Sequence, residues 1–380
     1  MNFFSDTLCQ RTKEGHLVCG DTFQIARTQS GTVCVICDGV GSGVYANISA
    51  VTCASRLMEL WRCGVSVRAA SEMVASSMHR ARTEDIPFSA FVAAAVLPDG
   101  QFLCYTYEAP DPVLVHGGSA AVLVPRFYTA GFEVIGEARG VMGEGDALVM
   151  FSDGVSQAGM GCGYDFGIGS ETVAAFINQS LAAREPLPAI PEKVADMCRA
   201  ASQGRHADDT TLAMLECRRA RELTLLTGPP SKPGMDRSYA EEFMSKPGMK
   251  VACGSTTAEI LARELDCRVE MSVPGGSLGE PPEYFIDGID LATEGAVTLN
   301  QAYNILDVPA GELTGNSAVE RLCLMLRSAD VVHLMIGNAM NVAHEDLLFR
   351  QIGVRIRRTT ISLIAETLRR MGKLVTEKHF

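Results

Sequence analysis

The segment VCVICDGVGSG, residues 33–43, runs from five apolar residues into an aspartate and a set of three glycines. Two later segments share this plan: ALVMF at 147–151 leads into SDG at 152–154, and DDTT at 208–211 opens the apolar run TLAML. Each apolar run has the length and composition of a buried β-strand. Carboxylates gathered at neighbouring strand ends repel one another unless cations lie between them, and Mg²⁺ and Mn²⁺ prefer oxygen ligands. The three strings therefore predict a metal-dependent enzyme.

The order of strand and helix patterns over the first 219 residues indicates antiparallel sheets. Turn signals at 28–32 and at 98–100 join pairs of strands as hairpins. Apolar residues recur at helical spacing in two pairs of segments, 44–62 with 65–82 and about 171–182 with 190–202. Hairpin-linked strands with paired helices favour an α/β (α+β) fold in which helices cover antiparallel sheets, and they disfavour a parallel Rossmann-type sheet.

The chain is too long for one typical core, so two domains are expected. We predict a first domain at 1–219, a linker with a short helix at 220–249, and a second, smaller α/β domain at 250–380. The linker assignment depends on the text TLLTGPPSKP and on the two SKPGM strings that bracket residues 236–243. The second domain alternates strand and helix patterns more regularly than the first.

The overall composition argues against several classes of protein. The net charge is −12, which disfavours nucleic acid or an anionic membrane as the main partner. No segment approaches the ~20 consecutive apolar residues of a membrane-spanning helix, and the opening residues are unlike a secretory signal. Thirteen cysteines, an odd number without a framework pattern, are typical of reduced thiols. We therefore expect a cytoplasmic protein with no membrane insertion and no nucleic-acid partner.

The residues around the aspartates suit hydrolysis with two metal ions. Asp38 can bridge two metals, and the glycines after it let backbone groups approach the ions, so that Gly39 can offer its carbonyl. A pair of divalent ions can orient a water for in-line attack on a phosphoryl group without a nucleophilic side chain. Asp-Gly is also a turn dipeptide, and for any one string alone a turn is the better interpretation. Three ordered strings at strand ends reverse that preference.

The ordered set DGVGSG, FSDG and DDTT, with a Gly-Asp pair at 20–21, resembles the motifs of the metal-dependent type 2C protein serine/threonine phosphatases, most closely their bacterial stage II sporulation E branch. The resemblance covers roughly residues 1–217. It implies an αββα sandwich, two Mn²⁺ or Mg²⁺ ions, and hydrolysis of phosphoserine or phosphothreonine on a partner protein by activated water. Regulators of bacterial signalling, such as antagonists of anti-sigma factors, are the substrates it implies. The implied metal ligands are Asp21, Asp38, Gly39, Asp153 and Asp208, and the implied catalytic residues are Asp38 and Asp209.

Two departures from that family bear on the phosphate contact and on the proton donor. Eukaryotic members carry a histidine two positions after the bridging aspartate, where this chain has Val40. They also carry an arginine upstream, where this chain reads KEGHLVCGD and has His16. His16, Gly41, Ser42 and Gly43 are the candidate phosphate contacts, although a simple turn is the favoured interpretation of the glycine loop. His206 is interpreted as a solvated loop residue, and a metal-binding or acid role is the less favoured alternative.

Two alternative functions stay open. One is a catalytically weak scaffold that binds phosphoproteins. The other is a sensor whose C-terminal domain binds a small anionic ligand. For the second, the string GSTTA at 254–258 follows the strand KVAC and begins a helix, where amides and hydroxyls can hold a phosphate; ordinary Ser/Thr capping is the simpler interpretation.

Overall fold

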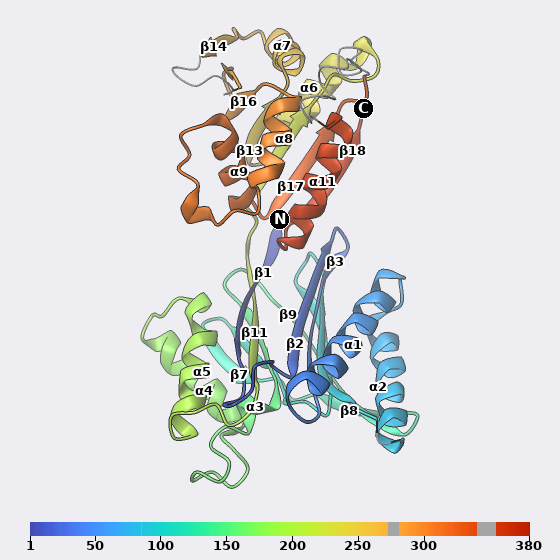
Figure 1. Ribbon diagram of the computed structural model, residues 1–380, viewed down its shortest axis with the longest axis vertical. Helices are drawn as coiled ribbons and strands as arrows, with labels where there is room; N and C mark the ends of the chain where they lie inside the picture. Colours follow the sequence, from blue (N-terminus) through green and yellow to red (C-terminus); the bar gives the residue numbers. More distant parts are fainter. Residues whose placement is uncertain (85, 273–280, 340–354) are drawn as a thin grey trace. The chain divides into compact units, whose positions relative to one another are not determined.

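A computed structural model describes residues 1–84, 86–272, 281–339 and 355–380 (Figure 1). The chain divides into two compact units, Met1–Arg219 and Ala220–Phe380. Each unit has its own sheets, helices and hydrophobic core. No helix within the described residues is both long and apolar enough to cross a membrane.

The first unit contains two sheets that are antiparallel throughout. One has the strand order β2-β3-β4-β5-β9-β8, and the other has the order β1-β11-β10-β6-β7. The strands of the six-stranded sheet are β2 (Asp21–Thr28), β3 (Gly31–Gly39), β4 (Ser89–Val96), β5 (Gln101–Tyr107), β8 (Arg126–Ala130) and β9 (Glu133–Val141). Those of the five-stranded sheet are β1 (Asn2–Arg11), β6 (Val113–His116), β7 (Ser119–Val122), β10 (Ala147–Phe151) and β11 (Thr210–Arg219).

Helices cover the outer face of each sheet, which gives the order helix, sheet, sheet, helix (Figure 1). The helices α1 (Gly43–Arg62) and α2 (Val67–Thr83) pack on the six-stranded sheet, and α4 (Gly169–Ala182) and α5 (Ile190–Ala201) pack on the five-stranded sheet. Two short helical segments, α3 (Asp153–Ser156) and η1 (Leu187–Ala189), complete the unit. The predicted αββα sandwich is therefore confirmed.

The inner faces of the two sheets meet in a core of buried side chains. Residues of β3 alternate between this core, which takes Cys34 and Ile36, and the helix-facing core, which takes Val33, Val35 and Cys37. The period of two explains why VCVIC is apolar without interruption: both faces of β3 are covered. Burial of each such side chain stabilises the fold by about 1.5–3 kcal/mol.

The second unit is built on a seven-stranded sheet of order β14-β15-β16-β13-β12-β17-β18. The five strands from β16 to β18 are parallel, and β14 and β15 are antiparallel additions at one edge. The strands are β12 (Glu222–Thr227), β13 (Met249–Cys253), β14 (Glu270–Ser272), β15 (Glu283–Phe285), β16 (Leu291–Thr293), β17 (Val331–Ile336) and β18 (Leu374–His379). The helical segments are η2 (Pro233–Met235), α6 (Asp236–Ser245), α7 (Ser255–Glu264), α8 (Ala296–Ile305), η3 (Ala310–Glu312), α9 (Ala318–Ser328) and α11 (Arg357–Arg370).

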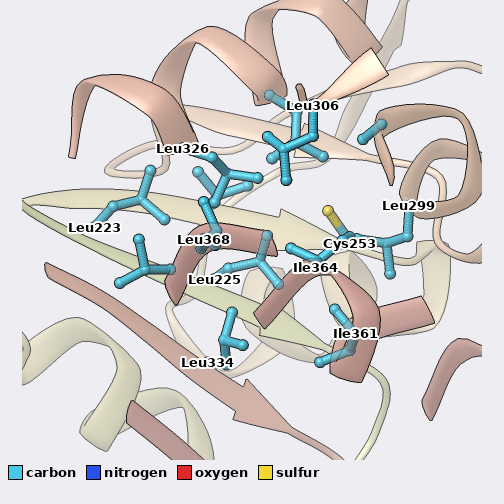
Figure 2. Close-up of a cluster of buried hydrophobic side chains, with 14 of the residues drawn as sticks. Leu223, Leu225, Cys253, Leu299, Leu306, Leu326, Leu334, Ile361, Ile364 and Leu368 are labelled. Carbon is cyan, nitrogen blue, oxygen red and sulfur yellow. The ribbon is translucent and has the colours of Figure 1, made fainter. Parts of the chain in front are cut away.

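Helices lie on both faces of this parallel sheet. One face packs against α8, α9 and α11, and Figure 2 shows that core, in which Leu225 and Leu334 of the sheet join Ile361, Ile364 and Leu368 of α11. The adjacent strand residues point to the other face and pack against α6 and α7. The second unit is thus doubly wound, with β12 in the interior of its sheet.

The position of β12 corrects the sequence-based prediction of a linker at 220–249. The short run at 222–227 is the first strand of the second unit and pairs in parallel with both β13 and β17. The prediction was misled by the adjacent Gly-Pro-Pro loop, because the six residues ELTLLT are too few for their pattern to mark a strand beside turn residues. The short helix expected in that segment is present as α6.

Candidate metal centre

Asp21 and Asp38 are brought together by the register of the β2–β3 hairpin. They are directly opposed residues, at the start of β2 and near the end of β3. Asp21 is only 2% exposed. The Ser152 hydroxyl of the other sheet donates to Asp21 Oδ2 at 2.7 Å, whereas Asp21 Oδ1 is buried without a hydrogen-bond partner among the described residues. One carboxylate oxygen is therefore fixed, and the other is open to a further ligand.

The SDG and DDTT strings meet where β10 ends and β11 begins. These strands are antiparallel, and the amide of Ser152 donates to the carbonyl of Thr211 at 3.0 Å. A Cβ on Gly154 would lie 2.0 Å from the carbonyl oxygen of Asp209 and 3.4 Å from Cβ of Asp208. Glycine is required at 154 because the two strings cross at backbone contact. Asp153 directly precedes this crossing in one string, and Asp208 belongs to the other.

The electrostatics of Asp38 show that the carboxylates of both sheets converge. Burial raises the pKa of Asp38 to about 10, and the neighbouring charges of Asp21, Asp153 and Asp208 add to that rise. Burial also raises the pKa of Asp21 to about 7, with a further contribution from Asp209, while hydrogen bonds from Ser152 and Thr211 oppose the rise. Like charges that gather in a partly dry site disfavour ionisation in this way.

Asp209 has a different environment from the other four aspartates. It is buried, its Oδ1 accepts from the Lys13 amide at 2.8 Å, and its Oδ2 accepts from the Gly20 amide at 2.8 Å. With each carboxylate oxygen bonded to a backbone amide, Asp209 anchors the loop between β1 and β2. This anchoring positions Asp21, the residue that follows Gly20.

Two side chains that the sequence analysis did not single out engage the exposed carboxylates. Lys13 Nζ lies 3.2 Å from Asp208 Oδ1, and Gln157 Nε2 donates to Asp153 Oδ2 at 2.9 Å. Lys13 comes from the loop anchored by Asp209, 195 residues earlier in the chain than its partner. Gln157 comes one turn after Asp153. No local sequence signal distinguishes Lys13 from a surface lysine, whereas the spacing of Gln157 from Asp153 is that of a helical i,i+4 pair.

The predicted phosphate contacts gather at the N-terminus of α1. Gly41 and Gly43 have φ values of +104° and +71°, and the N-cap Ser42 makes no capping hydrogen bond with its side chain. A Cβ on Gly43 would lie 3.4 Å from the His16 ring, so His16 stands at the same helix end. Gly39 is also constrained, since a Cβ there would lie 1.9 Å from the carbonyl oxygen of Ala46.

His206 lies apart from the carboxylates. Its ring Nδ1 is buried without a partner among the described residues, and burial lowers its pKa, with smaller contributions from Arg11 and Arg199. Its charged neighbours are these arginines and Asp196 on α5, not Asp208. The sequence-based interpretation of His206 as a solvated residue is wrong about the Nδ1 atom, which the first unit encloses.

The donor set fits a hard divalent cation. Within the described ranges, no three histidine, cysteine or acidic side chains already stand in a metal-binding arrangement. The converging carboxylates nevertheless offer only oxygen donors, Asp21 Oδ1 has no partner, and Asp38 carries a strongly raised pKa. A divalent cation would relieve the repulsion that raises this pKa, and oxygen ligands are those that Mg²⁺ and Mn²⁺ prefer.

Comparison with known proteins identifies the family. The model of the stage II sporulation protein E (SpoIIE) family matches residues 28–218. No curated protein matches the chain.

Several solved structures are similar to this chain. The PP2C phosphatase domain of SpoIIE from Bacillus subtilis with a fragment of its regulatory domain has a TM-score of 0.48 and 17% identity, over 57% of this chain and 64% of that one, so the match spans less than two thirds of its length. The RsbU and RsbW domains of Rv1364c from Mycobacterium tuberculosis give 0.49 and 19%, over 63% and 67%. RsbX in complex with magnesium gives 0.41 and 15%, over 57% and 100%. Since the family model matches half of the chain, this protein belongs to the SpoIIE family and carries its PP2C-type serine/threonine phosphatase domain.

Proposed function

We propose that the first unit, residues 1–219, hydrolyses phosphoserine or phosphothreonine on a partner protein. The observation that carries this proposal is the convergence of three other carboxylates, Asp21, Asp153 and Asp208, on Asp38, whose pKa is raised to about 10. Membership of the SpoIIE family supports the reaction class. Like charges gathered in a partly buried site destabilise the fold, so their presence favours a catalytic role over a structural one.

Two Mn²⁺ or Mg²⁺ ions are the cofactors that we assign to this site. Asp38 would contact both ions, Asp153 and Asp208 would complete one ion's ligand set, and Asp21 and the Gly39 carbonyl would serve the other. When bound, such ions supply an activated water near neutral pH and neutralise charge on a phosphoryl group.

The chain's own residues orient the substrate and the ligands. The backbone amides at the N-terminus of α1, with His16 beside them, offer donors to the phosphoryl oxygens. Asp209 holds the loop that carries Lys13 and His16, and Ser152 fixes one oxygen of Asp21. We therefore assign Asp209 a positioning role, and not the direct catalytic role that the family resemblance implied.

An exposed apolar patch supports a protein as the substrate. Val40, Val44, Tyr45 and Ile48 continue directly from the Asp38 loop into α1, and each is at least half exposed, with Tyr45 at 77%. We define these four residues as the α1 patch. Contiguous exposed apolar side chains mark surfaces that bind a macromolecule, whereas a small phosphate ester needs no such surface. An antagonist of an anti-sigma factor in the bacterial cytoplasm is the class of signalling partner that we propose.

The test is phosphate release by the full chain from a phosphoserine protein, with Mn²⁺, with Mg²⁺ and with chelator. Wild type should release phosphate only with a divalent ion, and Asp38→Asn should not. Asp165→Asn, in an exposed bend, is the matched control and should behave as wild type. A wild-type protein that is folded, binds Mn²⁺ and yet releases no phosphate from any phosphoserine protein would overturn the proposal.

A binding scaffold without hydrolysis is the second candidate. The observation that favours it is Val40, which is half exposed and stands where eukaryotic members of the family carry a histidine. The same experiment separates the two functions, because a scaffold would retain the phosphoprotein with its phosphate in place.

A further inference from the structure

A pocket of about 280 Å³ lies in the second unit, where three parallel strands end. Its walls come from the residues that follow β12, β13 and β16 and from the start of α11. β12 is the strand at which the winding of the sheet reverses, since β13 and β16 lie on one side of it and β17 and β18 on the other. Ligands of open α/β sheets bind outside the carboxyl ends of the strands at such a reversal.

A glycine follows four of the five parallel strands at this end of the sheet, and three of these glycines lie close against neighbouring groups. A Cβ on Gly228 would lie 2.1 Å from the Arg357 guanidinium carbon, one on Gly295 would lie 3.2 Å from Cα of Gly254, and one on Gly337 would lie 2.1 Å from the Gly228 carbonyl oxygen. The strand ends therefore expose backbone atoms around the pocket, and the Arg357 guanidinium contacts Gly228.

The N-terminus of α7 enters this pocket without a cap. Its N-cap residue is Gly254, with φ of +130° and no side chain to accept from the first amides. Ser255 and Thr256 belong to the helix itself and line the pocket. The simpler interpretation of GSTTA as ordinary Ser/Thr capping is therefore wrong, and these amides and hydroxyls are available to a ligand.

Two buried polar groups independently point to a missing partner. Thr257 lines the pocket and is fully buried, yet its Oγ1 has no hydrogen-bond partner in the described part of the chain. Arg357 also lines the pocket, and its Nε is buried and unpartnered. Its Nη2 donates to the Gly337 carbonyl at 2.7 Å, and no acidic side chain within the described ranges forms an ion pair with it. Buried hydroxyls and cations are normally paired, so both groups can donate a hydrogen bond to an acceptor on a ligand in the pocket.

The neighbouring helix α8 has at its N-terminus the kind of acceptor that α7 lacks. At the N-terminus of α8, the carboxylate of Glu294 accepts from the amides of Val297 at 3.0 Å and Thr298 at 3.4 Å. The chain supplies its own anion there, whereas α7 has none. Glu294 also gives the pocket wall an acceptor for ligand hydroxyls.

We propose that this pocket binds a small phosphate monoester whose organic part carries hydroxyl groups. The phosphate would accept from the α7 amides, Thr257 Oγ1 and Arg357, a set of donors that suits a doubly charged tetrahedral anion. The hydroxyls would donate to Glu294. None of the described residues that line the pocket is aromatic, so none offers a face on which a nucleobase could stack, which favours a phosphorylated sugar over a nucleotide.

The experiment measures binding of inorganic phosphate and of ribose 5-phosphate to the full chain by titration calorimetry. Asp38→Asn protein in chelator is used throughout, so that phosphate cannot occupy the metal centre of the first unit. Ribose 5-phosphate should bind more tightly than inorganic phosphate. Arg357→Met should weaken both by about tenfold or more, because a charge-assisted hydrogen bond is lost.

Two further variants keep the result interpretable. Thr257→Val preserves the shape of the side chain, removes only the hydroxyl, and should weaken binding severalfold even if Arg357→Met fails to fold. Arg358→Gln removes the adjacent, exposed arginine and should leave the affinity within twofold. Three results would each overturn the proposal. The first is equal affinity in the Thr257 variant and the unmodified pocket, and the second is no binding of either probe at millimolar concentration. The third is tighter binding of AMP than of ribose 5-phosphate. None of these outcomes depends on phosphatase activity.

Discussion

Asp38 combines burial with three carboxylate neighbours, and its removal should therefore have opposite effects on activity and on stability. Asp38→Asn should lower phosphate release by roughly 100-fold or more, since several kcal/mol of metal-dependent stabilisation depend on it. Without metal, burial and the neighbouring carboxylates keep the folded-state Asp38 protonated at neutral pH, and asparagine does not carry the cost of that proton uptake. We expect the Asn variant to be more stable than wild type in chelator.

The difference in stability between Asp38→Asn and wild type should depend on pH with a defined sign. The pKa of Asp38 is about 10 in the folded protein and about 3.8 when the group is free, so the folded state holds a proton that the unfolded state has released. The free energy of unfolding of the wild type therefore falls as pH rises from 4 towards 10. In chelator, the Tm advantage of Asp38→Asn should be larger at pH 9 than at pH 5. An advantage that is constant with pH, or that matches that of Asp165→Asn, would contradict this electrostatic account.

Gly154 carries a prediction about backbone geometry. A Cβ there would meet the Asp209 carbonyl at 2.0 Å, so Gly154→Ala must separate the SDG and DDTT strings. We expect a loss of activity larger than tenfold and a lower Tm, measured by phosphate release and thermal unfolding. Gly143→Ala is the matched control, because its Cβ would meet only Asp146 Oδ2 at an ordinary 3.7 Å. Wild-type activity in Gly154→Ala would show that the crossing does not set the positions of Asp153 and Asp208.

At the scale of elements, α1 connects the catalytic loop to the α1 patch. Ile48→Asp places a charge in that patch and should reduce kcat/KM for a phosphoprotein by about tenfold, because a desolvated apolar contact is lost. The change for an aryl phosphate should be far smaller, since that ester does not reach the patch. Val124→Asp, at an apolar site between β7 and β8 that is even more exposed than Ile48, is the control. Equal losses on both substrates would indicate that α1 itself is disturbed and that the patch does not bind the partner.

The elements that could be predicted from the sequence are those with a strong local pattern. The paired helices and the two hairpins have helical spacing or turn dipeptides, and all are present. β1 was missed because its residues do not alternate: Ser5, Asp6 and Thr7 interrupt it, and it pairs only with β11 at a sheet edge. β12 was missed for the opposite reason, since it is buried on both faces and resembles any short apolar run.

Some residues of the candidate sites could likewise be predicted from the sequence, and others could not. Asp21, Asp38, Asp153 and Asp208 could be proposed from ordered strings; in the structure Asp21 lies opposite Asp38, and the charges of Asp21, Asp153 and Asp208 help to raise the pKa of Asp38. Lys13, and in the second unit Thr257 and Arg357, required coordinates, because each acts through neighbours distant in the sequence. Their significance lies in missing or long-range partners, which no sequence window contains.

At the scale of the whole molecule, two separate cores predict two responses to ligands. Mn²⁺ should stabilise the first unit, and ribose 5-phosphate should stabilise the second, each by RT ln(1 + [L]/Kd). In calorimetry of the full chain, Mn²⁺ should raise the midpoint temperature of one unfolding transition, and the sugar phosphate should raise that of another. Asp38→Asn should abolish only the shift caused by Mn²⁺. A single transition that responds equally to both ligands would contradict independent unfolding of the units.

The pairing of β1 with β11 has a consequence for synthesis on the ribosome. The ten residues of β1 face the ten of β11 in continuous register, from Asn2 opposite Arg219 to Arg11 opposite Thr210. After β1 leaves the exit tunnel, about 200 further residues must therefore be translated before its partner strand exists. Asp208 and Asp209 emerge only at that moment, so the nascent chain completes its carboxylate cluster together with the closure of the five-stranded sheet.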